Sequence, residues 1–172
     1  GAVCIPLLVA ALLGTAMAVI QVVGPALANG QWLAAMTIDG RAGANLRQPN
    51  HLSSLLIWSM VALVWVAGSM GDRLGRHQNH IVGVGLLVLL LGVVLTVSRT
   101  GAVCVLILAA WAIFDKSLSR AMRLMLLAAP LVYALMWWGM GQWPVVDHQG
   151  FAGEQQLHRA DLSSSRFGIW TN

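Results

Sequence analysis

Long apolar segments separated by short polar ones constrain this chain more than any other feature. A helix needs about 20 mainly apolar residues to cross the hydrocarbon core of a bilayer. The candidate spans are residues 2–23, 52–70, 81–97, 102–118 and 124–142. The pattern predicts an all-α, polytopic membrane protein with about five transmembrane helices, in a transmembrane region over residues 1–143.

The composition supports the membrane class. The chain is 58% hydrophobic and 9% charged, whereas soluble domains carry about 25% charged residues. The net charge of +4 does not predict nucleic-acid binding, because the cations are spread over short loops and form no basic stripe. Cys4 and Cys104 lie inside apolar runs, where they act as small hydrophobes. His148 and His158 have no metal-ligand spacing, so no metal site is expected.

The two ends of the chain indicate a piece of a longer protein. Gly1 already lies within an apolar run, and the chain does not begin with Met. Residues 144–172 are polar and are expected to begin a large extracytoplasmic loop. We therefore expect the chain to be an internal fragment.

Short loops predict the orientation of the spans. Residues 71–80 and 115–123 are dense in cations and share one side, which the positive-inside rule assigns to the cytoplasm. The cations expected on the outer side are Arg41, Arg47, Arg99, Arg159 and Arg166. All of them are arginine, whose planar fork suits phosphate oxygens. The outer side is therefore the expected site for an anion.

The first outer cluster, residues 41–52, is expected to present an anion-binding helix start. Asn50 is the predicted N-cap of the second span, with Pro49 just before the helix. A helix N-terminus attracts negative charge, and Arg41 and Arg47 would approach it from the loop. The alternative is ordinary capping, with arginines that reach lipid headgroups.

The second cluster, residues 96–101, is a tight turn between the third and fourth spans. Arg99 is expected to be buried and to hold a phosphate, oriented by Thr96 and Ser98, while Gly101 permits the reversal of the chain. A turn arginine that reaches lipid phosphate is the alternative.

In the third cluster, residues 163–170, Arg166 and Trp170 have helical i, i+4 spacing, so the indole could stack on the guanidinium. An interfacial helix with its Trp at the headgroups explains the same spacing.

These clusters carry a family resemblance. Residues 43–52, GANLRQPNHL, closely resemble the QPNHL signature of bacterial protein O-oligosaccharyltransferases, the protein glycosylation ligases related to O-antigen ligases and polymerases. Residues 96–101, TVSRTG, are similar to the family's T-x-S-R-T/G turn, and residues 166–170, RFGIW, to its R-x-x-x-W element. The order of the three motifs also matches, and the resemblance spans nearly the whole chain.

The resemblance implies an inverting glycosyl transfer at the periplasmic face of the bacterial inner membrane. The donor would be a glycan on undecaprenyl diphosphate, and the acceptor a Ser or Thr hydroxyl of an exported protein such as a pilin. The implied partners are thus a lipid-linked oligosaccharide, an acceptor protein and membrane lipids, with no nucleic acid. No cofactor or metal is expected at the transfer step.

The motif match also implies the site residues. Arg99 and Arg166 are the expected diphosphate contacts. The other residues expected in the substrate site are Arg47, Gln48, Asn50, His51, Ser98 and Trp170. The family places an essential histidine later in the periplasmic loop, and no match occurs before Asn172. The general base is therefore expected beyond Asn172, and the fragment alone is expected to be inactive.

Other functions stay open. A ligase that moves O-antigen to lipid A-core, or an O-antigen polymerase, would keep the enzyme class and change the acceptor. A transporter or flippase of a lipid-linked anion would also need arginines, but no repeat is visible and no span has an ionisable residue at its centre. For a structural membrane subunit, the repeated polar clusters would be coincidental.

Overall fold

The fold is all-α, as predicted. The structure, a computed structural model, describes residues 2–36, 40–69 and 77–142. Its α-helices are α1 (Cys4–Val23), α2 (Pro49–Ser69), α4 (Gln78–Thr96), α5 (Arg99–Phe114) and α6 (Arg120–Gly141). Two short 3-10 helices, η1 (Pro25–Leu27) and η2 (Ala44–Leu46), lie between α1 and α2. The described ranges contain no β-strand.

Four of the helices are long and apolar enough to cross a membrane: α1, α2, α4 and α6. The fifth, α5, has 16 residues, which gives it a length of about 24 Å against about 30 Å for the hydrocarbon core. It ends at Phe114, before the predicted residue 118, because the backbone becomes extended at its C-cap, Asp115. The Asp115 carboxylate accepts from the Ser117 backbone N–H at 2.9 Å in the turn that follows. These helices are those of a membrane-embedded protein.

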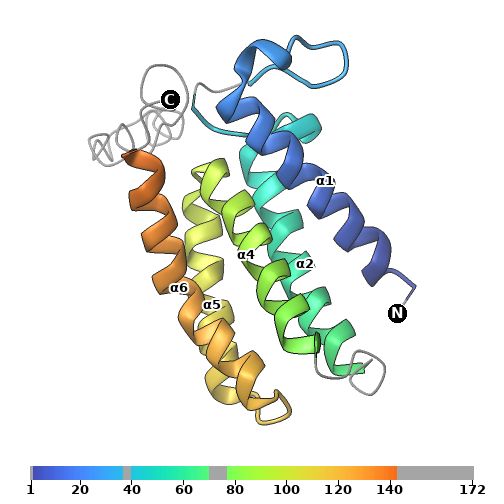
Figure 1. The fold of residues 1–172 in the computed structure, drawn as a ribbon, viewed down its shortest axis with the longest axis vertical. Helices are drawn as coiled ribbons and strands as arrows, with labels where there is room; N and C mark the ends of the chain where they lie inside the picture. Colours follow the sequence, from blue (N-terminus) through green and yellow to red (C-terminus); the bar gives the residue numbers. More distant parts are fainter. Residues whose placement is uncertain (1, 37–39, 70–76, 143–172) are drawn as a thin grey trace, which may run out of the picture.

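Successive helices run in opposite directions, so the connections gather at two ends of the bundle (Figure 1). The segment between α1 and α2 lies at the same end as the turn between α4 and α5. We call this the arginine end, after Arg41, Arg47 and Arg99. The opposite end contains the start of α4 and the turn between α5 and α6.

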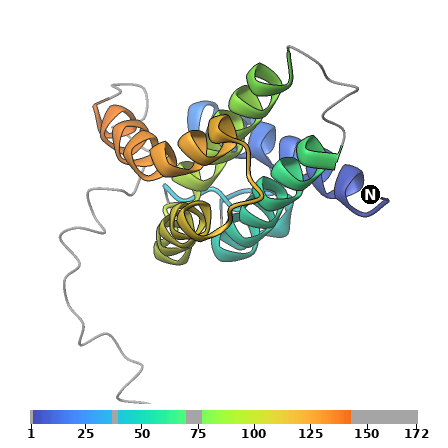
Figure 2. The same cartoon turned by 90° about the horizontal axis from the view of Figure 1, so that it is seen from below.

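Helix α4 lies at the centre of the bundle. It packs against α1, α2 and α6, and α2 packs against α5 (Figure 2). Small residues bring these helices close together. A Cβ built on Gly92 of α4 would lie 2.6 Å from the Thr15 hydroxyl of α1, and one built on Gly85 would lie 2.7 Å from Leu63 of α2. Close backbone approach at small residues is typical of helix packing in membranes.

The outward faces of the helices are apolar, as a hydrocarbon environment requires. Leu13 of α1, Leu106 of α5 and Leu131 of α6 are all more than half exposed. A soluble monomer rarely exposes an apolar surface of this extent. The outward faces therefore support membrane embedding independently of helix length.

Four of the helices begin earlier than the predicted spans, whereas α1 begins later, at Cys4 rather than residue 2. Helix α2 begins at Pro49, and Asn50 is its second residue, so the prediction of Asn50 as N-cap was wrong. Proline suits the first helical position because its missing N–H would have no partner within the helix. The same early start, with polar residues in the first turn, occurs in α4 and α6.

Candidate functional site

The segment around Arg41 is attached to the C-terminal end of α4. The Ala42 backbone N–H donates to the Leu95 carbonyl at 3.0 Å, and the Arg41 Nε–H donates to the Thr96 carbonyl at 3.3 Å. The last carbonyls of a helix have no partner within it, so they are available acceptors. These two bonds bring the first and second sequence clusters together.

A second link joins the start of α2 to the start of α5. The Ser98 hydroxyl donates to Oδ1 of Asn50 at 3.0 Å and accepts from the Gly101 N–H at 3.2 Å. Ser98 is thus the N-cap of α5. Asn50 contributes its side-chain oxygen to this link instead of capping its own helix.

Gly101 does not serve the chain reversal that was predicted for it. The left-handed residue of this turn is Val97, with φ 49°, and Gly101 lies inside α5. A Cβ on Gly101 would lie 2.5 Å from the Ser53 hydroxyl and 2.8 Å from Val93. Glycine is needed here because α5 approaches α2 and α4 closely.

Arg41 and Arg99 place two positive charges near one another at the arginine end. Burial of Arg41 lowers the pKa of its guanidinium, and the charge of Arg99 lowers it further. The guanidinium keeps its proton at neutral pH. Within the described ranges the acidic residue is Asp115, beside the turn at the opposite end. The described part of the arginine end therefore has excess positive charge, which a bound anion would balance.

The surroundings of Arg99 differ from those expected. Arg99 is exposed, so the prediction that it is buried was wrong. It is the first residue of α5, at the arginine end of the bundle. The hydroxyls of Thr96 and Ser98 do not orient it as expected, because that of Thr96 donates to Val93 and that of Ser98 to Asn50.

Arg47, Gln48 and His51 follow one another into α2, and all are exposed. Arg47 has a left-handed backbone, with φ 56°, at the C-terminus of η2. The Gln48 carbonyl accepts from the His51 N–H at 3.1 Å, which closes the first turn of α2. These residues are close to Asn50 in the sequence, and they lie with it at the arginine end of the bundle.

Arg41 is not among the residues that the motif match assigns to the substrate site, although the first cluster was expected to bring it toward the start of the second span. Arg41 binds a backbone carbonyl. Since every residue has one, this partner could not be identified from the sequence. The available signal is local composition: its neighbours Gly40 and Ala42 are small and buried, so the chain can approach α4 closely.

Several predicted features lie outside the described residues. They are Arg166, Trp170, Arg159, His148, His158 and the proposed loop over 144–172. Among the residues with described positions, no group of three His, Cys, Asp or Glu side chains could hold a metal ion.

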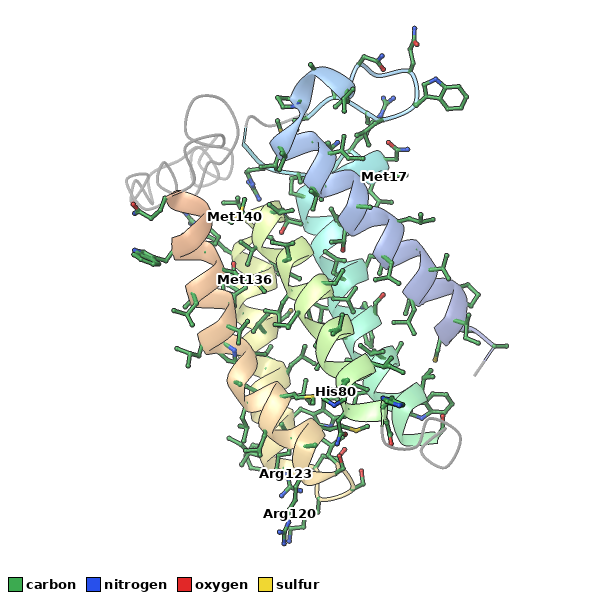
Figure 3. All side chains as sticks on the ribbon, in the orientation of Figure 1. Met17, His80, Arg120, Arg123, Met136 and Met140 are labelled. Carbon is green, nitrogen blue, oxygen red and sulfur yellow. The ribbon has the colours of Figure 1, made fainter. Side chains whose placement is uncertain are left out.

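The opposite end also holds basic residues, in a different setting. Arg120, Arg123 and His80 lie there, far from Met17 and Met140 (Figure 3). The Asp115 carboxylate accepts from the Ser117 hydroxyl and backbone N–H, and these bonds lower the pKa of Asp115. Nη2 of Arg123 donates to the Asp115 carbonyl at 3.1 Å.

A comparison with protein families matches the first cluster and the helix that follows it. The family model described as protein glycosylation ligase matches residues 42–66. The matched stretch begins at the residue whose N–H binds α4 and continues through most of α2. Comparisons with curated proteins and with solved structures gave no match. The family match supports a glycosyltransferase or ligase that acts on proteins.

Proposed function

We propose that this chain is part of a protein O-oligosaccharyltransferase of the bacterial inner membrane. The enzyme transfers a glycan from undecaprenyl diphosphate to Ser or Thr hydroxyls of exported proteins, with inversion, at the periplasmic face. The arginine end then faces the periplasm, and the opposite end faces the cytoplasm.

The observation that carries the proposal is where the family match falls in the fold. The matched residues 42–66 include Asn50, whose side chain accepts from Ser98 at 3.0 Å, next to Arg99. The glycosylation-ligase segment is thus bound directly to the second arginine cluster. Two motifs that are far apart in the chain meet at one surface.

The chemistry of the transfer fits an arginine-rich surface. The acceptor oxygen forms a bond to the anomeric carbon, while the bond from that carbon to the diphosphate oxygen breaks. Negative charge then grows on the leaving diphosphate, and fixed cations lower the energy of that state. The hydroxyl proton must pass to a base, and we assign that role to a histidine beyond Asn172.

Within this proposal Arg99 and Arg41 contact the diphosphate. Arg47, Gln48, Asn50, His51 and Ser98 line the donor site around them. Arg166 and Trp170 complete it from the periplasmic loop. The half-buried position of Arg41 supports its role, because a partly desolvated guanidinium binds an anion more strongly than an exposed one.

The test is the destination of the glycan in living cells. The natural full-length protein is expressed in bacteria that build a lipid-linked glycan, lack any ligase, and contain a candidate pilin. Mass spectrometry and glycan blots then locate the sugar. We expect it on a Ser or Thr of the exported protein.

Each other destination would contradict the proposed acceptor. Glycan on lipid A-core would indicate an O-antigen ligase, and lengthened lipid-linked chains would indicate a polymerase. Absence of transfer to every acceptor would contradict the enzyme class and favour transport of a lipid-linked anion.

A further inference from the structure

Gln21 is a polar side chain buried within the apolar helix α1. It is 0% exposed, yet it lies in a segment expected to face lipid or other helices. A primary amide is costly to bury unless its hydrogen-bonding groups are satisfied. Its partners therefore indicate why the residue is there.

The side chain of Gln21 binds backbone groups of the segment between α1 and α2. Oε1 accepts from the Gly43 N–H at 3.2 Å and from the Ala44 N–H at 2.9 Å. Nε2 donates to the Ala34 carbonyl at 2.7 Å and approaches the Ala44 carbonyl at 3.4 Å. The amide of Gln21 thus binds both backbone groups of Ala44.

The backbone that Gln21 holds is in a conformation that the residue types do not favour. Ala44 has φ 47°, a left-handed value that is uncommon for a residue other than glycine. Such a conformation persists only where the surroundings determine it. The chain is also closely packed at the preceding residue, where only glycine fits, because a Cβ on Gly43 would lie 2.9 Å from the Gln48 nitrogen.

A second side chain supports the same arrangement. Oδ1 of Asn45 accepts from the Ala34 N–H at 2.9 Å, and its Nδ2 donates to the Trp32 carbonyl at 3.2 Å. Gln21 and Asn45 together hold residues 32–34 against residues 43–45. The loop is therefore closed before it reaches α2.

The segment held by Gln21 is attached to α4 on its other side. Ala42 binds the Leu95 carbonyl and Arg41 binds the Thr96 carbonyl. The backbone that bears Arg41 is thus fixed between α1 and α4, and Arg47 follows it after one turn of η2.

We propose that Gln21 is a positioning residue for donor binding and turnover: it presets the loop that places Arg41 and Arg47 at the diphosphate site. The inference rests on the proposed function. Gln21 touches no substrate and acts through the backbone of Gly43 and Ala44. Without the Gln21 amide, the donor itself must order Arg41 and Arg47 when it binds, and this lowers the rate of glycan transfer.

The main test variant is Gln21→Met in the natural full-length protein, because Met has similar length and removes the amide. Hydrogen exchange of the peptide containing Gly43 and Ala44 should become faster. Transfer from a purified lipid-linked oligosaccharide, per folded enzyme, should fall on the order of 10²-fold, the scale expected when catalytic groups are misplaced by about 1 Å. The KM for the acceptor peptide should not change.

The matched control is Thr15→Val, another buried polar residue of α1. Its hydroxyl donates to the Ala11 carbonyl of its own helix at 3.0 Å, so its loss should change neither loop exchange nor transfer. If Gln21→Met does not accumulate, Gln21→Glu replaces it. The glutamate keeps an oxygen for the Gly43 and Ala44 N–H groups but sets its second oxygen against the Ala34 carbonyl, so it should also speed loop exchange and lower transfer.

Three results would overturn the proposal. One is unchanged exchange around Gly43, and another is faster exchange with normal transfer. The third is a loss of folded protein while each remaining folded molecule keeps wild-type kinetics, which is the behaviour of a purely structural residue. Absence of transfer by the wild-type protein would refute the proposed function itself. The exchange measurement does not depend on transfer, so it shows separately whether Gln21 holds the loop.

Discussion

The two ends of the bundle both carry cations, but they are organised differently. At the arginine end, hydrogen bonds join segments far apart in sequence, such as Arg41 to Thr96 and Asn50 to Ser98. At the opposite end the hydrogen bonds of the turn between α5 and α6 are local, from Ser117 and Arg123 to Asp115. Among the described residues, Gln78 of α4 also binds the Ala67 carbonyl of α2 at the opposite end. The arginines themselves differ: Arg41 binds a carbonyl far along the chain, at Thr96, whereas Arg123 binds one in the neighbouring turn, at Asp115.

The difference separates two uses of positive charge in a membrane protein. Cations in a short local turn suffice to anchor and orient helices at the headgroups. A site for a charged substrate needs cations whose positions are set beforehand, because preorganised charge does not have to reorient during the reaction. The arginine end meets that requirement, and the following substitutions test it.

Arg41→Ala should have the largest effect. It removes a half-buried charge and the bond to the Thr96 carbonyl, and we expect transfer to fall about 10²–10³-fold, the scale for loss of one preorganised donor. The measurement is kcat with purified lipid-linked glycan and acceptor peptide. The control is Arg120→Ala, which should retain near wild-type turnover. Equal losses in both variants would remove the distinction between the ends.

Gly101→Ala should destabilise the protein by about 1–3 kcal/mol, as overpacking of a close helix contact does. The new Cβ would meet the Ser53 hydroxyl and Val93. Thermal unfolding in detergent measures the change. Gly139→Ala is the matched control, since a Cβ there meets nothing within 4 Å. Adding Ser53→Ala to Gly101→Ala should restore part of the lost stability, because it removes the hydroxyl that the new Cβ meets. If the effects of the two substitutions on stability were simply additive, this contact would be contradicted.

Ser98→Ala should cost about 1 kcal/mol of stability, the typical effect of losing an N-cap. It also frees Asn50 from α5, so transfer should fall more than the stability change alone explains. Thermal unfolding and kcat are measured on the same preparation. Ser119→Ala, which removes the N-cap of α6 at the opposite end, is the control and should affect stability without lowering kcat. A loss of kcat in both variants would show that capping, not the link to Asn50, matters.

Ser117→Ala should have the smallest effect. The Ser117 hydroxyl lowers the pKa of Asp115, so its removal should raise that pKa toward the ordinary carboxyl value. A lowered folded-state pKa stabilises the protein above the ordinary carboxyl pKa, and this contribution is lost as the pH falls through the folded value. The variant and wild type should therefore differ slightly at neutral pH and converge in acid, with equal transfer. An effect on transfer would contradict the separation of the two ends.

The helix interiors could be predicted because apolar runs of membrane length allow few other structures. Their starts could not. Helix α2 begins at Pro49 rather than Leu52, and α4 at Gln78 rather than Ile81, because polar residues occupy the first turns and hydropathy excludes them. The alternation of spans correctly brought the first two clusters to the same end of the bundle.

The connections within the candidate site could not be predicted from residue types. Arg41 binds a carbonyl, and Gln21 binds the backbone of Ala44. Every residue carries such backbone groups, so they give no pattern in the sequence. Asn50 and Gly101 were singled out for helix capping and chain reversal, which are their commonest local roles, whereas here both make contacts between helices.

The most direct test of the account compares Arg99→Lys at the arginine end with Arg120→Lys at the opposite end. Both variants keep the charge and lose the planar fork. The quantity measured is kcat for glycan transfer from a lipid-linked donor. We expect kcat to fall greatly in Arg99→Lys and to stay nearly normal in Arg120→Lys, with equal membrane insertion of the two variants. Full activity in Arg99→Lys would contradict the assignment of the arginine end as the diphosphate site.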